Sequence, residues 1–224
     1  EEMKDDFVSN MTHELKTPIA IAYSANDALL NYDTDNDPQK KVTYLNIANK
    51  QLKRLGELVE NILAMSMERR KTMKLKPETV LLRPFVEEIA TAQRMRGEKK
   101  ITINVDVDAN TSIETDRTHL SNILNNLIDN AIKYSGDSVA ITISGNGKEI
   151  SVADNGIGIP AGSLPYLFNK FYRVPHGNRQ DVRGYGIGLY YVKSIIDKMG
   201  WAIDVRSKER EGSVFTIKIN NDGQ

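Results

Sequence analysis

The sequence contains no cysteine, and this absence removes several kinds of chemistry at once. Disulfide bonds, thiolate nucleophiles and zinc sites built on cysteine are all excluded. A chain without cysteine also fits a reducing compartment. With 224 residues it is long enough for one large domain or two small ones, with at least one real core.

The sequence also lacks an excess of charge of either sign and any long hydrophobic run. Lysine plus arginine and aspartate plus glutamate each number 30, so the formal net charge is zero. No basic stripe with interleaved aromatics occurs, so we expect neither nucleic acid nor an acidic membrane as the main partner. No apolar run is long enough to span a bilayer, and no signal peptide opens the chain. We expect membrane contact only through an N-terminal region absent from this chain.

The first third of the sequence has the periodicity of two long helices. Residues 2–30 contain few helix breakers, and a polar, Asp-rich turn follows over residues 31–38. Pro38 suits the first turn of the second helix, where its missing N–H is harmless. Apolar side chains repeat at steps of three and four at Phe7, Met11, Leu15, Pro18, Ala22, Ala25 and Leu29, and at Leu45, Ala48, Leu52, Leu55, Val59 and Ile62.

This pattern predicts a helical hairpin with a heptad seam that needs a partner. Two helices alone bury little surface, so a dimeric four-helix bundle is the simplest solution. The alternative is packing of the seam against the second domain of the same chain. We assign residues 1–68 to the helical domain, 69–78 to a basic linker and 79–224 to the second domain.

The second domain alternates strand and helix patterns, which predicts a sheet with helices on one face, an α/β sandwich. The fold class of the whole chain is therefore α+β. Asp116 is expected to cap a helix that runs to Tyr134. Strands are predicted over residues 79–82, 101–107, 139–144, 150–154, 201–207 and 213–219, helices also over 84–95 and 187–199, and an irregular stretch over 160–183.

The first candidate site is a histidine on the first helix. His13 stands beside Glu14 and shortly before Pro18, which is expected to kink the helix. Imidazole is a good phosphoryl acceptor near neutral pH because one ring nitrogen is free to attack. A carboxylate could hold the proton of the other nitrogen. An ordinary surface histidine is the alternative, and this cluster alone does not decide between them.

A second cluster lies on the helix predicted after Asp116. Asn126, Asn130 and Lys133 (or Tyr134) fall at helical spacing and share one face. An amide oxygen is a hard ligand suited to Mg²⁺, and lysine binds phosphate as a point charge. Taken alone, the pattern is more typical of an ordinary polar helix face.

Two glycine-containing segments follow. In residues 154–160, a buried Asp154 at a strand end can accept a hydrogen bond from an exocyclic amine such as that of adenine, although alone this pattern is only a turn. The two glycines let the backbone pass close to a flat ring. In residues 184–189, glycines open a helix whose N-terminus can hold phosphate. A Rossmann loop is excluded because no strand leads directly into this segment.

Together these segments resemble the sequence boxes of sensor histidine kinases. Residues 13–18 resemble the H-box, and residues 126–134, 154–160 and 184–189 resemble the N, G1 and G2 boxes. Residues 167–173 resemble the F-box. The resemblance covers nearly the whole chain. It implies a dimerisation and phosphotransfer bundle followed by an ATP-binding domain of the Bergerat fold, with ATP and Mg²⁺ as cofactors.

The resemblance also implies roles for individual residues. His13 would be the phosphoacceptor and Glu14 its acid–base neighbour. Thr17 takes the place that positions water for dephosphorylating a response regulator in many members. Asn130 would ligate Mg²⁺, and Asp154 would accept a hydrogen bond from the adenine amine. The mobile ATP lid would lie between Gly158 and Gly184. The nucleotide-binding set is Asn126, Asn130, Lys133, Tyr134, Asp154, Gly156, Gly158, Ile159, Phe171, Arg173, Gly184, Tyr185, Gly186, Ile187, Gly188 and Leu189.

The implied partners are a second copy of the chain and the receiver domain of a response regulator, whose aspartate takes the phosphoryl group from His13. Whether the chain also removes that phosphate stays open. The resemblance implies the cytoplasmic portion of a membrane-anchored bacterial sensor. The chain departs from the family pattern at Lys16, where arginine is commoner, and at Tyr190 and Tyr191, where small residues are usual.

Two other functions compete with this interpretation. ATPases of the DNA gyrase kind share the pocket but carry a glutamate general base one helical turn before the magnesium asparagine. Here that position is Asn126, so hydrolysis by water should be slow and His13 supplies the attacking group. The second competitor is a catalytically inactive dimeric scaffold, against which the intact boxes argue.

Overall fold

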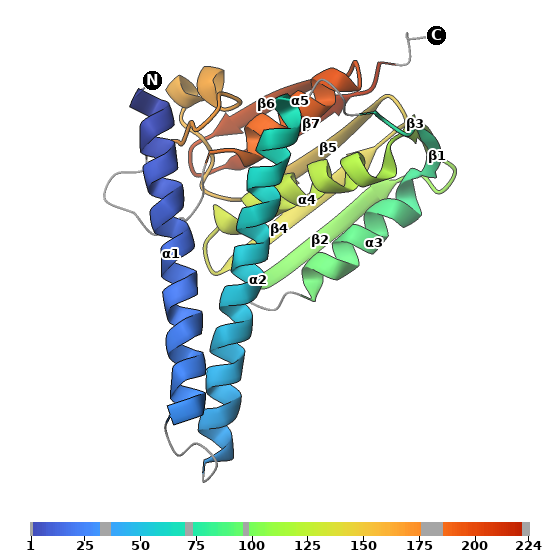
Figure 1. Cartoon of the computed structure of the whole chain (residues 1–224). Coiled ribbons are helices and arrows are strands. Elements are labelled where there is room, and N and C mark those ends of the chain that lie inside the picture. The colour runs from blue at the N-terminus through green and yellow to red at the C-terminus, as the bar shows by residue number, and fades with distance from the viewer. Residues whose placement is uncertain (1, 32–36, 70–73, 96–98, 176–185, 221–224) are drawn as a thin grey trace. The chain divides into compact units, whose positions relative to one another are not determined.

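The computed structural model divides the chain into two compact units, Glu1–Thr72 and Met73–Gln224, which are described separately (Figure 1). The structure describes residues 2–31, 37–69, 74–95, 99–175 and 186–220. In the first unit the side chains of residues 2–11, 13, 14, 53, 54 and 57–69 are not described. Regular structure extends to Arg69 and resumes at Glu78, at the two ends of the segment assigned as a linker.

The first unit is a helical hairpin of α1 (Glu2–Asn31) and α2 (Pro38–Arg69), as the periodicity predicts. Pro18 and Ala25 on α1 are buried, and the other described members of their stripe are half-buried. This stripe packs against α2, since the two helices are in extended contact. The apolar pattern on α1 therefore serves the hairpin itself.

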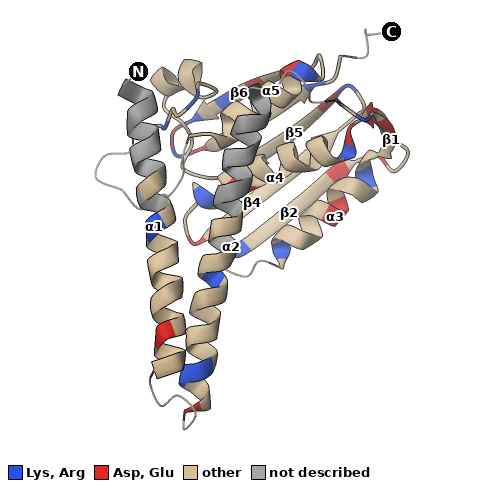
Figure 2. Ribbon diagram, in the orientation of Figure 1, with Lys and Arg blue, Asp and Glu red and all other residues tan. Residues whose placement is uncertain are grey.

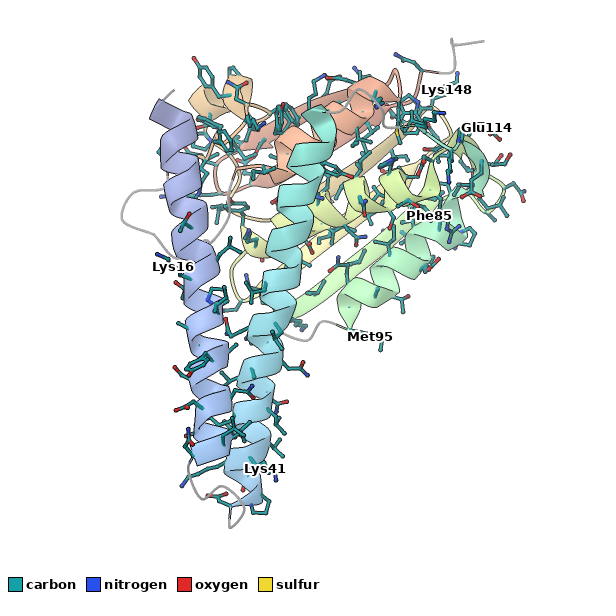
Figure 3. All side chains as sticks on the ribbon, viewed as in Figure 1. Lys16, Lys41, Phe85, Met95, Glu114 and Lys148 are labelled. Carbon is teal, nitrogen blue, oxygen red and sulfur yellow. The ribbon has the colours of Figure 1, made fainter. Side chains whose placement is uncertain are left out.

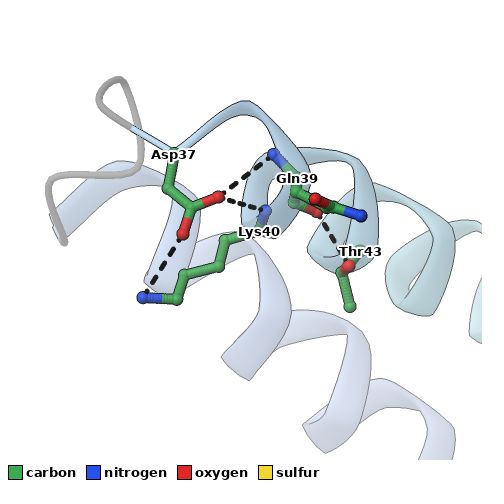
Figure 4. Close-up of polar contacts among 4 residues, drawn as sticks. All are labelled: Asp37, Gln39, Lys40 and Thr43. Carbon is green, nitrogen blue, oxygen red and sulfur yellow. Dashed lines mark hydrogen bonds and ion pairs between the residues drawn. The ribbon is translucent and has the colours of Figure 1, made fainter.

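The N-terminus of α2 has a well-formed cap (Figure 4). The Asp37 Oδ1 atom accepts hydrogen bonds from the backbone N–H groups of Gln39 (3.2 Å) and Lys40 (3.1 Å), and Lys40 Nζ lies 3.5 Å from Oδ2. The backbone N–H of Lys40 is the main reason why the pKa of Asp37 is lowered. Pro38 occupies the first helical position, where no N–H is needed. The predicted start of α2 is confirmed.

The second unit is built on a five-stranded mixed sheet in the order β2-β4-β5-β7-β6. Strands β2 and β4 are parallel, the other neighbours are antiparallel, and β1 pairs with β3 in a separate two-stranded sheet. The elements are β1 (Glu78–Leu81), α3 (Leu82–Arg94), β2 (Lys100–Val107), β3 (Ser112–Thr115), α4 (Arg117–Lys133), β4 (Ser138–Gly145), β5 (Glu149–Asp154), a 3-10 helix (Ala161–Tyr166), α5 (Gly188–Lys198), β6 (Ala202–Lys208) and β7 (Gly212–Lys218).

The core lies between one face of this sheet and the helices α3, α4 and α5 (Figure 1). Alternate residues of each strand point into it, such as Ile141 and Ile143 of β4 and Ile150 and Val152 of β5, all nearly fully buried. Phe85 of α3 belongs to the same core (Figure 3). The predicted sandwich with helices on one face is confirmed.

Two details differ from the predicted elements. Strand β3 was not predicted because Ile113 is the only apolar residue among its four, so no alternating pattern is visible. The stretch predicted to be irregular over residues 160–183 contains the 3-10 helix Ala161–Tyr166, which follows Pro160 and includes Pro165. Proline fixes φ near the helical value, so a short helical turn is compatible with both residues. Residues 176–183 lie outside the described part of the chain.

In the view of Figure 2, residues of both charge signs occur along the described parts of each unit. Among the helices of the described residues, none is long and apolar enough to cross a membrane.

The predicted cap of α4 is present and also holds the chain that enters the second unit. The Asp116 Oδ1 atom accepts the backbone N–H of His119 at 3.0 Å, and Oδ2 accepts the N–H of Lys76 at 2.9 Å. Burial raises the pKa of the Asp116 carboxyl, but these N–H groups, with that of Thr118, outweigh burial and hold the pKa below its usual value. The carboxylate thus fastens residue 76 to the start of α4.

Replacing Asp116 with alanine is expected to lower the free energy of unfolding by about 1–2 kcal/mol at neutral pH. A lowered folded-state pKa means that this contribution is complete above the unfolded pKa of about 3.9 and is lost as pH falls through the folded value. Denaturant titrations between pH 7 and pH 2 should therefore show the variant and wild type converging in acid. Asp106→Ala, which removes an exposed carboxylate, is the control, and a pH-independent difference at position 116 would contradict the assignment.

Candidate functional site

Helix α4 places the side chain of Asn126 against the N-terminus of α5. Asn126 and Asn130 are one turn apart and both half-buried. The Asn126 Nδ2 group donates to the carbonyl of Asn122 at 2.9 Å. A Cβ atom at Gly188, the first residue of α5, would lie 2.8 Å from Asn126 Oδ1. Any side chain at position 188 would therefore displace this amide, so glycine allows the two helices to approach.

The loop after β5 docks on the C-terminus of α4. The Oδ1 atom of Asp154, the last residue of β5, accepts the N–H of Gly156 at 2.8 Å. A Cβ atom at Gly156 would lie 2.8 Å from both Asp154 Oδ1 and the Tyr134 carbonyl oxygen, which accepts the N–H of Ile157 at 3.0 Å. Burial raises the pKa of Asp154, while backbone N–H groups of Gly156 and Ser213 oppose this. A carboxylate has further acceptor positions available for a ligand amine.

The hairpin of β6 and β7 supports this loop from the other side. Gly158 has φ +69°, and a Cβ atom there would lie 2.0 Å from the Lys208 carbonyl oxygen. The N–H of Ile159 donates to Ser207 Oγ at 2.8 Å. Gly212 has φ +100°, and its Cβ would lie 1.9 Å from the Asp154 carbonyl oxygen. Both glycines are therefore required by close backbone contacts as well as by φ.

Sequence reasoning missed Ser207, Gly212 and Ser213 as part of this support. Ser207 Oγ donates to the Gly212 carbonyl at 2.8 Å and lies 2.9 Å from Ser213 Oγ. The glycine between two predicted strands was a signal that a turn with unusual geometry lies there. The two serines give no such signal, because alternate polar residues are normal in a strand.

The segment after the 3-10 helix joins the glycine loop before α5. The N–H of Phe171, which has φ +68°, donates to the Gly186 carbonyl at 3.0 Å. Gly186 has φ +66°, and a Cβ atom there would lie 2.6 Å from the Tyr172 carbonyl oxygen. Ile187 is buried, and Leu189 is half-buried in the first turn of α5. Two positive φ values thus form one tight junction.

Cationic side chains lie near the C-terminus of α4. Lys133, its last residue, is exposed, and the neighbouring Tyr134 is half-buried. Burial raises the pKa of Tyr134, and the positive charge of Arg173 partly opposes this. Arg173 therefore lies close enough to Tyr134 to act on it electrostatically. The F-box segment approaches α4 at the end where the loop after β5 docks.

Four of the predicted site residues are described only partly or not at all. His13 and Glu14 lie in α1, but their side chains are outside the described part. Gly184 and Tyr185 lie wholly outside it. Thr17, one turn after His13, is exposed. The structure brings the described candidates of the second unit together, and the H-box belongs to the other unit.

A cavity of about 470 Å³ lies at the opposite end of the sheet from this site. It is bordered by the ends of β2 and β4 and the start of β5, whereas Asp154 stands at the end of β5. None of the candidate residues contributes to it. Its lining is Arg83, Val105, Asp106, Val107, Asp108, Ser144, Gly145, Asn146, Glu149 and Ser151.

The described candidates therefore form one cluster at the other end of the sheet, carried by α4, β5 and α5. It combines amide oxygens, a half-buried carboxylate, a glycine-rich helix N-terminus and cationic side chains. Amide oxygens suit a hard cation, and helix N-termini and cations suit phosphate. The carboxylate suits a ring amine. This set matches the chemical parts of a nucleoside triphosphate with its metal ion.

Comparison with protein families assigns both units. Residues 3–70 match the His Kinase A (phospho-acceptor) domain, HisKA. Residues 115–223 match HATPase_c, the histidine kinase-, DNA gyrase B- and HSP90-like ATPase family. A HisKA domain followed by a HATPase_c domain is the arrangement of sensor histidine kinases, and the chain belongs to this family. Its second unit is an ATP-binding domain.

Individual relatives agree with this assignment. The sensor protein RprX of Bacteroides fragilis is 37% identical over 97% of this chain, which spans 44% of RprX. The structure of the Acinetobacter baumannii histidine kinase AdeS has a TM-score of 0.68 and 26% identity, covering 94% of this chain and 98% of that one. Histidine kinase ThkA, solved in complex with the response regulator protein TrrA, has a TM-score of 0.65 and 25% identity, covering 96% of this chain and 60% of that one. The chain thus spans less than half the length of RprX.

Proposed function

We propose that this chain is the catalytic core that uses ATP to phosphorylate its own His13 and then passes the phosphoryl group to an aspartate of a response regulator. The observation that carries the proposal is the cluster on α4, β5 and α5, in a chain whose α1 carries His13. The family assignment supports the same conclusion. The test is the chemistry of the label from γ-labelled ATP, since a phosphohistidine is labile in acid and stable in base.

The nucleotide is held by residues of the second unit. In this proposal Asp154 accepts a hydrogen bond from the adenine amine, and Tyr134 lines the adenine pocket. Lys133, Arg173 and the N-terminus of α5 meet the phosphates. Phosphoryl transfer requires mostly positioning and charge stabilisation from a protein, and these groups provide both.

A magnesium ion fits the residues present on α4. Asn126 Oδ1 faces the glycine at the start of α5, and Asn130 follows it by one helical turn. We assign Asn130 as the protein ligand, with Asn126 beside it, because amide oxygens are hard ligands for this ion. When bound, the ion would neutralise charge on the phosphate oxygens.

The acceptor is the imidazole of His13 rather than water. Its free ring nitrogen forms a bond to the γ-phosphorus while the bond from that phosphorus to the bridging oxygen of ADP breaks. Glu14 holds the proton on the other ring nitrogen. Asn126 stands where gyrase-type ATPases carry a glutamate base, and an amide cannot remove a proton from water. Because donor and acceptor belong to separate units, a domain movement is expected to control the rate.

We also propose that the first unit forms a homodimer through a four-helix bundle. Leu45 and Leu52 of the α2 seam are 50% and 58% exposed in the single chain. Ile19 and Val42 are also more than half exposed. Several large apolar side chains on one hairpin favour coverage by a second copy.

Replacing Leu52 with glutamate is expected to convert the dimer into a monomer at low micromolar concentration. A charge buried in the bundle without a partner makes dimer formation less favourable by roughly several kcal/mol. Light scattering across a dilution series measures the change. Leu81→Glu is the matched control, because Leu81 is 54% exposed on β1 of the other unit. Wild-type protein that stays monomeric at high micromolar concentration would refute the bundle.

The proposed partner is the receiver domain of a response regulator, because a phosphohistidine is a suitable donor to an aspartate. ThkA, a relative of similar fold, was solved with a response regulator protein. Thr17 is exposed one turn after His13, where its hydroxyl would orient water for removing the regulator's phosphate.

We also propose a location for this core. Because it uses ATP as its substrate, we expect it to lie in the cytoplasm, and we propose that a further N-terminal region anchors it to the membrane.

A further inference from the structure

Lys170 is held between two aromatic rings that belong to different segments. Its Nζ atom lies 5.6 Å from the ring centroid of Phe171 and 5.2 Å from that of Tyr190 on α5. All three residues are half-buried. Both distances are within the range of about 6 Å at which an ammonium group is attracted to a ring face. Lys170 thus links the F-box segment to the first turn of α5.

The residues that follow Lys170 interact with residues at the ends of both helices of the candidate site. Phe171 is hydrogen-bonded to Gly186, just before α5. Arg173 acts on Tyr134, at the C-terminus of α4. Residues 170–173 therefore bridge the ends of the two helices on which we place the metal ligand and the phosphate-binding N-terminus.

Helix α5 is fastened to α4 by a separate set of contacts. The Asn122 Nδ2 group donates to Tyr191 Oη at 3.4 Å, and Gly188 packs against Asn126 Oδ1. These contacts place α5 on α4, and the Lys170–Tyr190 contact adds to the Phe171–Gly186 hydrogen bond in placing residues 170–173 relative to α5.

We propose that Lys170 and Tyr190 are a positioning pair that fixes Arg173 and the start of α5 in one arrangement around the ATP phosphates. This inference rests on the proposed nucleotide function. Neither residue needs to touch ATP: the pair acts through the junction of Phe171 and Gly186, which carries Arg173 on one side and the helix N-terminus on the other. Without the pair, one restraint on the segment that carries Arg173 is lost, so more of its ordering must occur when the nucleotide binds, and the affinity falls accordingly.

The test measures binding of the magnesium complex of a non-hydrolysable ATP analogue to the full chain. Tyr190→Leu and Lys170→Met remove the ring and the charge while keeping most of the apolar volume. Each is expected to weaken binding about 2- to 5-fold, the range of an exposed to half-buried cation–π contact. Tyr190→Phe keeps the ring face and should bind like wild type. Lys193→Met is the control, because Lys193 lies on the same helix but pairs with Asp197.

A double-mutant cycle shows whether Lys170 and Tyr190 act together on nucleotide binding or have two independent effects on it. The Lys170→Met/Tyr190→Leu protein should bind no more weakly than the poorer single variant, with the unfolding midpoint without nucleotide close to wild type. Unchanged binding by Tyr190→Leu, or a double-variant loss equal to the product of the single losses, would overturn the inference. If the proposed function itself were wrong, wild-type protein would fail to bind the analogue or to incorporate label from ATP.

Discussion

Replacing His13 with alanine is expected to reduce the acid-labile label from γ-labelled ATP at least about 10³-fold, because the attacking nitrogen is gone. Nucleotide binding should stay near normal, since all the proposed nucleotide residues belong to Met73–Gln224 and His13 belongs to the other unit. Labelling is measured on the isolated protein after acid and base treatment. A fluorescent ATP analogue measures binding in the same preparation.

Two further variants make this test specific. His119→Ala removes one of the other two histidines and should leave labelling intact, although its position near the cap of α4 can lower stability. Thr17→Ala should spare labelling and forward transfer but slow the loss of phosphate from the receiver in the presence of ADP. If Thr17 only packs before Pro18, both activities change together or neither does. Acid-labile phosphate retained by the His13 variant would reject the acceptor.

Asn130→Ala is expected to weaken magnesium-dependent ATP binding by at least about 10-fold, because the protein loses its oxygen ligand. Asn130→Asp should also fail, since the new charge would face the phosphates. The measurement titrates a fluorescent ATP analogue with and without Mg²⁺, so that loss of the metal contribution is separated from loss of adenine binding.

Asn125→Ala is the matched control for this variant. Asn125 lies on α4 as well, but its Oδ1 atom accepts a hydrogen bond from the buried Gln93 at 2.9 Å. Its replacement should lower stability and leave the magnesium dependence of binding unchanged. An Asn130→Ala protein with wild-type magnesium dependence would show that the ion has another ligand.

Local patterns account for most of the fold. The start of α2 at Pro38, the cap at Asp116 and the strands predicted over 139–144 and 150–154 all depend on neighbours in the sequence, and each is present. Strand β3 was not predicted because Ile113 is its only apolar residue, and the 3-10 helix at 161–166 was not predicted because its glycine and proline are typical of a loop. Tertiary pairing with β1 makes a strand of residues 112–115.

For the candidate site too, the sequence predicts the residues, whereas only the structure shows which of them meet. Asn126, Asn130, Asp154 and the glycines before α5 were found because the residue types that phosphate and metal chemistry need occur in short segments. The sequence alone left open which of them meet. In the structure, Asn126 faces Gly188, and the loop after Asp154 docks on Tyr134, across separations that no local pattern spans.

Sequence was therefore sufficient for the family, the α+β class, the hairpin and the residues proposed for chemistry, because helix periodicity and the boxes are local properties. Only the tertiary structure decided the strand order, the support of the Asp154 loop by Ser207 and Gly212, and the placement of Lys170 against Tyr190. These features depend on how side chains and backbone pack between segments that are distant in the chain, and burial, close contact and ring geometry exist only once the chain has folded.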